Sequence, residues 1–243
     1  HDDVMDGDAN RRHRATVWKV FGVPQAVLIG DALLGRAFEV LAEEMRDPLA
    51  ARTLAAAVGD LLHGQGDDVA FETRDDVSLT DCVAMAGRKT GALLACACAL
   101  GALAGGGTPE QIGRLRAFGA DVGLAFQLVD DILGIWGDPR VTGKPVHSDL
   151  RSRKRSLPVV AALASGHPSV KLLSQVYSQR SDLDDATVAQ LAEVVERAGG
   201  REWCVAQARM LIGRAVEGLA ADPTLTRTAE LAGLARLLIE RDR

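Results

Sequence analysis

Residues 109–136 read P-E-Q-I-G-R-L-R-A-F-G-A-D-V-G-L-A-F-Q-L-V-D-D-I-L-G-I-W, and this segment decides the fold class of the chain. Its apolar side chains recur every three or four residues, which is the period of a helix that buries one face. Pro109 suits the first turn of a helix, and the sequence Gly137-Asp138-Pro139 ends one. The segment therefore predicts a long helix from Pro109 to about Trp136.

The same helical period continues in both directions, and no strand pattern competes with it. Only 4% of the residues are aromatic and 47% are hydrophobic, which favours helices over a β-sandwich. The sequence predicts an all-α protein with further helices over residues 23–45, 48–62, 78–105, 157–164, 169–180, 185–198, 201–220 and 224–241. No repeat or flexible linker divides the chain, so we expect one domain over residues 1–243.

The composition excludes one class of function and indicates a compartment. The chain has 28 Lys and Arg against 33 Asp and Glu, a formal net charge of −5, so no nucleic-acid partner is expected. Its four cysteines form no C-x-x-C pair, which predicts buried free thiols in a reducing, cytoplasmic compartment. The longest uncharged stretch, residues 91–107, is too short and too rich in Ala and Gly for a transmembrane segment.

Two acids, Asp130 and Asp131, stand late in the central predicted helix. Carboxylates are unfavourable there, because the neighbouring residues are apolar and the C-terminal end of a helix dipole repels negative charge. Gln127 and Asp131 are four residues apart and share one face. Buried acids at such a position indicate a cation, and oxygen ligands suit Mg²⁺ that is completed by water and substrate phosphates.

Another acidic cluster, Asp2-Asp3-Val4-Met5-Asp6, stands at the start of the chain. On a helix, Asp2 and Asp6 project from one face about a turn apart and are placed to share cations. Acidic residues at a helix N-terminus also commonly face water, so that interpretation remains open for this cluster alone.

Basic residues accompany the two acidic clusters. Taken singly, each is typical of a solvated surface charge. Together with two clusters suited to Mg²⁺, they indicate a diphosphate held between metal ions and cationic donors. The residues concerned are Arg11, Arg12, Lys89, Lys144 and Lys154.

In the order and spacing of these motifs, the chain resembles the trans-isoprenyl diphosphate synthases, the family of the farnesyl and geranylgeranyl diphosphate synthases. The resemblance is close over about residues 2–158 and extends as helical scaffold beyond them. The matching segments are Asp2-Asp3-Val4-Met5-Asp6, Arg11-Arg12, Gly64-Gln65, Lys89-Thr90-Gly91, Gln127-Leu128-Val129-Asp130-Asp131, Thr142-Gly143-Lys144-Pro145, Asp149-Leu150 and Lys154.

The resemblance implies an isoprenoid-synthase-type helical bundle around a central apolar cavity, and a homodimer. It implies Asp2, Asp6 and Asp130 as ligands of several Mg²⁺ ions, supported by Asp3 and Asp131. It implies that diphosphates are bound by Arg11, Arg12, Lys89, Lys144 and Lys154, and that Lys89, Thr90 and Gln127 are catalytic positions. The implied reaction condenses isopentenyl diphosphate with an allylic prenyl diphosphate by ionisation, alkylation and proton loss.

The chain departs from the family pattern in three places, the smallest of which is Ala15 where the family usually has Pro before Thr16. Gly134 stands where the family usually has the last Asp of the second motif, which removes an outer carboxylate from the metal site. The family also has an N-terminal region with a Gly-Lys-x-Arg type motif that binds isopentenyl diphosphate. That region is absent from this chain, so we expect the domain to be N-terminally incomplete.

Two alternative functions belong to other classes. A class I terpene cyclase shares the acid chemistry but normally carries an N/D-x-x-S/T-x-x-x-E motif. In this chain Leu133 and Gly134 stand where that motif has its Ser or Thr. A non-catalytic partner subunit of a prenyl synthase would keep the fold without needing buried acids. The residues at positions 133 and 134 argue against the cyclase, and the two intact acidic clusters argue against the partner subunit.

Overall fold

The structure is a computed structural model that describes residues 1–11, 13–45, 47–143, 145–179 and 182–240. Its regular structure is almost entirely helical, which confirms the predicted fold class. Within the described residues, the only strands are β1 (Asn10–Arg11) and β2 (Arg14–Ala15), which pair antiparallel. This hairpin was not expected from the sequence; His13 makes it possible by adopting a left-handed φ of 62° in the turn.

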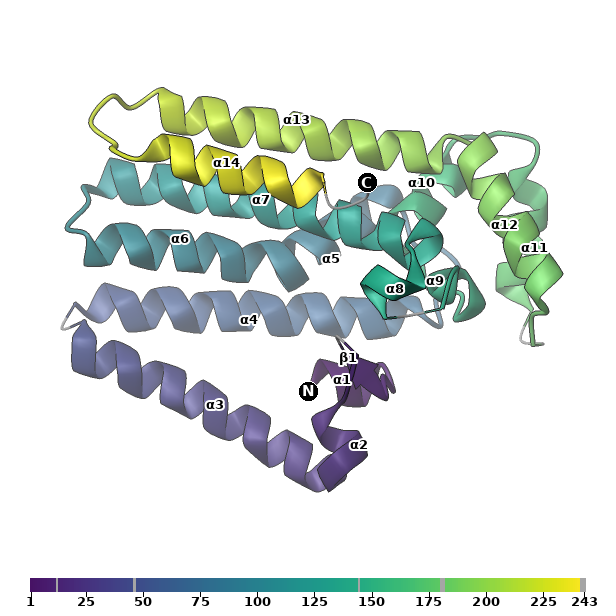
Figure 1. The fold of residues 1–243 in the computed structure, drawn as a ribbon, viewed down its shortest axis with the longest axis horizontal. Coiled ribbons are helices and arrows are strands. Elements are labelled where there is room, and N and C mark those ends of the chain that lie inside the picture. Colours follow the sequence, from purple (N-terminus) through teal and green to yellow (C-terminus); the bar gives the residue numbers. More distant parts are fainter. Residues whose placement is uncertain (12, 46, 144, 180–181, 241–243) are drawn as a thin grey trace.

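Long helices form the body of the molecule and lie nearly side by side (Figure 1). Helix α7 packs against both α6 and α13, and α6 packs in turn against α4, while α3 diverges from α4. The long helices are α3 (Val23–Glu44), α4 (Pro48–Phe71), α6 (Ala92–Ala104), α7 (Pro109–Trp136), α13 (Gly200–Ala220) and α14 (Thr228–Ile239).

Shorter helices gather where α7 ends and around the N-terminal hairpin (Figure 1). The stretch 137–155, which lies between two of the predicted helices, contains two helices of four residues each, α8 and α9. The remaining helices are α1 (Asp2–Met5), α2 (Val17–Phe21), α5 (Leu79–Ala86), α8 (Pro139–Thr142), α9 (Ser148–Arg151), α10 (Leu157–Ala164), α11 (Val170–Ser178) and α12 (Asp185–Arg197).

Local sequence signals explain where several helices begin. Ser78 and Asp81 form a reciprocal capping box at α5, and Thr108 and Gln111 form another at α7. The helix predicted over residues 78–105 is interrupted by the π-helical turn η1 (Gly87–Gly91). The prediction that the second long helix ends at Leu62 is wrong, because α4 continues to Phe71. Tertiary packing there overrides the low helix propensity of a Gly-Gln-Gly sequence.

The apolar residues form two adjoining clusters. The larger one joins α5, α7, α10 and α13 around Leu128, Ile132 and Leu157. The smaller one joins the end of α7 to α9, α10, α11 and α12 around Ile135 and Leu150. Helix α7 therefore anchors both clusters, while the apolar cavity expected inside the bundle stays a prediction.

Glycines allow η1 and α6 to approach α7 closely. A Cβ atom placed on Gly123 would lie 2.7 Å from the Cα atom of Gly91 and 3.2 Å from the carbonyl oxygen of Thr90. Backbone atoms cannot yield as the end of a flexible side chain does, so glycine is required at this crossing. At this crossing Thr90 lies beside Gly123 of α7, and Gln127 follows Gly123 by one helical turn.

We expect Gly123→Ala to lower the free energy of unfolding by about 1–3 kcal/mol, because the added methyl group forces α7 away from η1. Gly113 lies on the same helix with open space around its Cβ position, so Gly113→Ala is the matched control. The control should stabilise the protein by about 0.5–1 kcal/mol through helix propensity. Urea unfolding of both variants tests this, and equal effects would contradict the close approach.

The helical stretch Leu79–Ala104 is long and apolar enough to cross a membrane by length and composition, with a mean hydropathy of 1.3 in its best window. Core helices commonly pass the same test. This stretch carries the ion-paired Arg88 and Lys89, and its α6 part packs against α4 and α7.

Candidate active site

The first acidic cluster folds onto Arg11. Arg11 Nε donates a hydrogen bond to Asp3 Oδ1 (2.5 Å), and its Nη2 donates to Asp2 Oδ2 (3.1 Å). The hydroxyl of Thr16 donates to the carbonyl oxygen of Asp8 (2.8 Å), which ties the loop after α1 to the end of the hairpin. The hairpin therefore brings Arg11 back over α1 and holds it against both carboxylates.

Lys89 connects this cluster to the helical bundle. Its Nζ atom lies 2.7 Å from Asp68 Oδ2 and 3.2 Å from Asp2 Oδ1, and only 17% of its side chain is exposed. Burial disfavours the ammonium form, but Asp68 and Asp2 outweigh it and raise the pKa of Lys89. Burial likewise favours a neutral Asp2, but Lys89 and Arg11 outweigh it and lower the pKa of Asp2. Lys89 and Asp2 are therefore both charged at neutral pH.

The position of Lys89 depends on the π-helical turn and on a glycine. A Cβ atom on Gly64 of α4 would meet the backbone nitrogen of Lys89 and would lie 2.9 Å from its Cα atom. Gly64 thus permits contact between α4 and η1, and Asp68 follows one turn later on α4. Single π turns inside α-helices are frequent at functional sites. The turn η1 carries Lys89 and Thr90, two residues of the candidate site.

The second acidic cluster is held by hydrogen bonds on α7. Thr90 Oγ1 donates to Gln127 Oε1 (2.5 Å), and Gln127 Nε2 donates to Asp131 Oδ1 (2.8 Å). The backbone N–H of Leu157 donates to Asp131 Oδ2 (2.8 Å). Asp131 is 5% exposed, and this burial raises its pKa to about 7. Asp130, by contrast, is exposed.

Only one of these two adjacent acids therefore matches the expectation of burial. Asp131 is enclosed and fully hydrogen bonded, whereas Asp130 is accessible to a ligand from solvent. This division suits an outer supporting role for Asp131 and a direct contact for Asp130.

Lys154 is the cation that both clusters share. Burial disfavours its charged form, but the charges of Asp131, Asp68, Asp149 and Asp6 outweigh it and hold the pKa of Lys154 above its usual range. Burial and the charge of Asp2 raise the pKa of Asp6, while Lys154 partly offsets them. Lys154 therefore lies within electrostatic reach of acids from α1, α4, α7 and α9.

Lys154 lines a cleft of about 430 Å³ together with Asp6, Asp68 and Asp149. Its walls come from α1, the C-terminal end of α4, α9 and the segment that follows α9. Carboxylates predominate in the walls, with two cations among them. The charged lining residues are Asp6, Asp8, Asp68, Glu72, Asp149, Lys154 and Arg155.

The donor atoms of this site suit a hard divalent cation. Carboxylate oxygens are the ligands that Mg²⁺ prefers, and Mg²⁺ usually keeps waters or takes substrate phosphate oxygens. In the part of the chain that the structure describes, no three Asp, Glu, His or Cys side chains converge to hold an ion by themselves. A cation here would therefore share its coordination with a diphosphate, which the nearby Arg11, Lys89 and Lys154 would also attract.

The structure brings together most of the residues predicted from the sequence. Asp2, Asp3, Arg11 and Lys89 form one network, and Thr90, Gln127 and Asp131 form another. Arg12 and Lys144, predicted to bind diphosphate, lie outside the described residues.

Sequence reasoning missed Asp68, the principal partner of Lys89. Its neighbour Asp67 also pairs with η1, through Arg88 at 3.1 Å. The signal was present, since two acids follow the Gly64-Gln65 pair after one intervening glycine, but the helix was expected to end before them.

The family model described as Polyprenyl synthetase matches residues 1–195 of the chain. The chain belongs to the polyprenyl synthetase family. This polyprenyl synthetase is 43% identical to a (2E,6E)-farnesyl diphosphate synthase of Mycobacterium bovis, over 99% of the chain and 69% of the relative. The predicted resemblance and the enzyme class, a prenyltransferase that elongates isoprenoid chains, are confirmed.

Solved structures agree with this assignment. The crystal structure of a polyprenyl synthetase from Streptomyces coelicolor A3(2) matches with a TM-score of 0.90 and 46% identity, covering 98% of this chain and 73% of that one. A polyprenyl synthase from Caulobacter crescentus CB15, complexed with calcium and isoprenyl diphosphate, matches with a TM-score of 0.91 and 29% identity. That match covers 100% of this polyprenyl synthetase and 74% of the Caulobacter chain.

Proposed function

We propose that this polyprenyl synthetase condenses isopentenyl diphosphate with an allylic prenyl diphosphate in a Mg²⁺-dependent reaction and releases a longer linear prenyl diphosphate. The observation that carries the proposal is that the charges of Asp6 from the first acidic cluster and Asp131 from the second both act on Lys154, which lines a cleft with Asp6. Lys89 in turn pairs with Asp2 and Asp68. A farnesyl diphosphate synthase among the relatives supports the substrate class.

The metal ligands in this proposal are Asp2 and Asp6 from α1 and the exposed Asp130 from α7. Asp3 and Asp131 support them, since Asp3 is bound by Arg11 and Asp131 by Gln127. Bound Mg²⁺ supplies positive charge that stabilises the departing diphosphate. The carboxylate groups at the cleft would hold the metal ions, and the ammonium groups would hold the diphosphate beside them.

The cations change partners when substrate binds. In the free protein, Arg11 and Lys89 are paired with Asp2, Asp3 and Asp68. A bound diphosphate offers these cations charged oxygen acceptors, and Arg suits the bidentate geometry of phosphate. We assign the allylic diphosphate to Arg11, Lys89, Lys144 and Lys154, and the diphosphate of isopentenyl diphosphate to Arg12.

The reaction breaks the allylic carbon–oxygen bond and leaves an allylic cation and inorganic pyrophosphate. The double bond of isopentenyl diphosphate donates its electron pair to that cation, a new carbon–carbon bond forms, and a proton leaves to pyrophosphate. Thr90 and Gln127 form a hydrogen-bonded pair on facing helices. Their oxygen dipoles are assigned to the allylic carbons, where they stabilise the developing positive charge.

Product analysis tests the proposed function. The full-length protein is incubated with Mg²⁺, labelled isopentenyl diphosphate and each allylic diphosphate separately, and products are separated before and after phosphatase treatment. Linear prenyl alcohols that appear only after phosphatase are expected, and EDTA should abolish them. A hydrocarbon formed without isopentenyl incorporation would instead show a terpene cyclase. An absence of turnover would favour a non-catalytic partner subunit.

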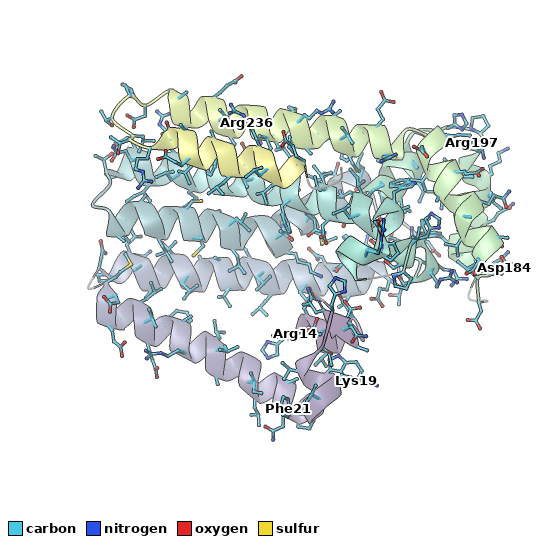
Figure 2. The ribbon with its side chains drawn as sticks, in the orientation of Figure 1. Arg14, Lys19, Phe21, Asp184, Arg197 and Arg236 are labelled. Carbon is cyan, nitrogen blue, oxygen red and sulfur yellow. The ribbon has the colours of Figure 1, made fainter. Side chains whose placement is uncertain are left out.

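We also propose that the protein is cytoplasmic and acts as a homodimer. Cys82, Cys96, Cys98 and Cys204 are free thiols, as a reducing compartment favours. Large apolar side chains are exposed on α2 and α3, among them Val20, Phe21, Leu28 and Leu33. Figure 2 shows Lys19 and Phe21 at the outer edge of α2, away from the bundle.

An exposed apolar surface of this kind marks an interaction site. We expect light scattering to give twice the chain mass. We expect Leu28→Glu combined with Leu33→Glu to shift the protein to monomer; an unchanged mass would contradict this interface.

A further inference from the structure

The helix that carries the first acidic cluster has little packing of its own. Helix α1 is four residues long, and none of its side chains is buried. Lys89 attaches it to the bundle, with Nζ 3.2 Å from Asp2 Oδ1. A rigid element attached at one point can still rotate about that point. The directions in which Asp2 and Asp6 face therefore depend on a second attachment.

His1 supplies such an attachment, to α3. Its Nε2 atom lies 3.0 Å from the carbonyl oxygen of Val27 and 3.3 Å from Asp31 Oδ1. A carbonyl oxygen can only accept a hydrogen bond, so Nε2 carries a proton and donates it to Val27. Val27 and Asp31 are four residues apart and share one face of α3. The imidazole is thus bound to one turn of that helix.

The same turn of α3 contains a glycine where the ring lies. A Cβ atom placed on Gly30 would lie 2.5 Å from both Cε1 and Nε2 of His1 and 2.9 Å from Cδ2. Atoms that are not bonded to each other do not approach so closely. The imidazole therefore occupies the space in which a side chain at position 30 would begin, and glycine leaves that space open.

The backbone of His1 begins α1. Its carbonyl oxygen accepts hydrogen bonds from the backbone N–H groups of Val4 and Met5, each 3.1 Å long. The backbone N–H of Asp6 in turn donates to the carbonyl oxygen of Asp2 (2.9 Å). One residue is therefore bound to α3 through its ring and to α1 through its main chain, and a displacement of the ring would move both carboxylates.

We propose that His1 is a positioning residue that fixes α1 to α3 and thereby sets the direction in which Asp2 and Asp6 face the Mg²⁺–diphosphate site. This inference rests on the proposed function, because it assumes that these two acids bind metal. His1 acts through the backbone of α1 and not by contact with the metal or the diphosphate. Gly30 is the other half of the attachment, since it leaves the space that the ring fills.

Calorimetric titration of inorganic pyrophosphate at a series of Mg²⁺ concentrations tests the proposal on the full-length protein. His1→Ala should raise the Mg²⁺ concentration for half-maximal binding by about tenfold, as the loss of a supporting partner does. His1→Gln should recover most of that loss, because the glutamine Nε2 can donate to the carbonyl oxygen of Val27. His63→Ala removes an imidazole from an exposed position of α4 and should leave the Mg²⁺ dependence unchanged.

Gly30→Ala, made in two backgrounds, separates this role from a general need for glycine in α3. In the wild type the added methyl group displaces the ring, so the shift should resemble that of His1→Ala. In His1→Ala the ring is already gone, so the same substitution should add less than about twofold. Gly35→Ala lies on the same helix with open space at its Cβ position and should change nothing in either background.

Thermal unfolding of each variant separates loss of binding from loss of folding. Three results would overturn the inference: unchanged Mg²⁺ dependence in His1→Ala, no recovery in His1→Gln, or an equal shift from Gly30→Ala in both backgrounds.

The titration contains no prenyl substrate, so its outcome is separate from the product assay. A wild-type protein that elongates prenyl chains while His1→Ala keeps its Mg²⁺ requirement would refute this inference alone. A shift in His1→Ala without any product from the wild type would refute the proposed function alone. Wild-type protein that binds no pyrophosphate with Mg²⁺ would refute both.

Discussion

Lys89→Met lowers kcat/KM for chain elongation by about 10²–10³-fold, the loss expected when a preorganised charge is removed from a developing oxyanion. Methionine keeps most of the length of the side chain but removes its charge. In the wild type that charge lies 2.7 Å from Asp68 and 3.2 Å from Asp2. Its loss removes the ammonium group beside Asp68, leaves Asp2 paired with Arg11 alone, and removes a donor for the allylic diphosphate. Steady-state kinetics with both substrates measure the effect.

Two further variants separate the structural part of this effect from the catalytic part. Asp68→Asn combined with Lys89→Met removes the uncompensated charge, so it should recover stability without recovering activity. Lys171→Met, at an exposed position of α11, is the matched control and should retain normal kinetics. Recovery of activity in the double variant would show that Lys89 serves only to neutralise Asp68.

Asp131→Ala lowers the free energy of unfolding by about 3–5 kcal/mol, the usual result of removing one partner from a buried charged network. The substitution deprives the buried N–H of Leu157 and the amide of Gln127 of their acceptors, each at 2.8 Å. It also leaves Lys154 without one of the acids that hold it charged. Denaturant unfolding followed by circular dichroism measures the loss.

The control for this prediction is Asp60→Ala, at an exposed position of α4, which should change stability by less than about 0.5 kcal/mol. Asp131→Asn retains one carbonyl acceptor for the Leu157 N–H and should therefore cost less than alanine. A loss below about 1 kcal/mol for Asp131→Ala would mean that water replaces the carboxylate, and that the network is weaker than its geometry indicates.

Local sequence pattern was sufficient for the helices and for most of the candidate site. The apolar period of residues 109–136 predicted α7, and the capping residues Ser78 and Thr108 stand where α5 and α7 begin. Such features depend on residues three or four positions apart, so they can be read along the chain. The acidic motifs were equally visible, because the spacing of Asp2 and Asp6 defines a helical face without any tertiary contact.

The partners of these residues depended on contacts between distant segments. Lys89 meets Asp68, Thr90 meets Gln127, and Asp149 fills the place beside Gly134 only because helices far apart in the chain approach closely at glycines. The same packing makes Asp131 buried and its neighbour Asp130 exposed. The helical period assigns each residue to a face of its helix. The burial of that residue and its bonding partners depend on the element that packs against that face. The spacing of residues along the sequence does not predict where that element lies.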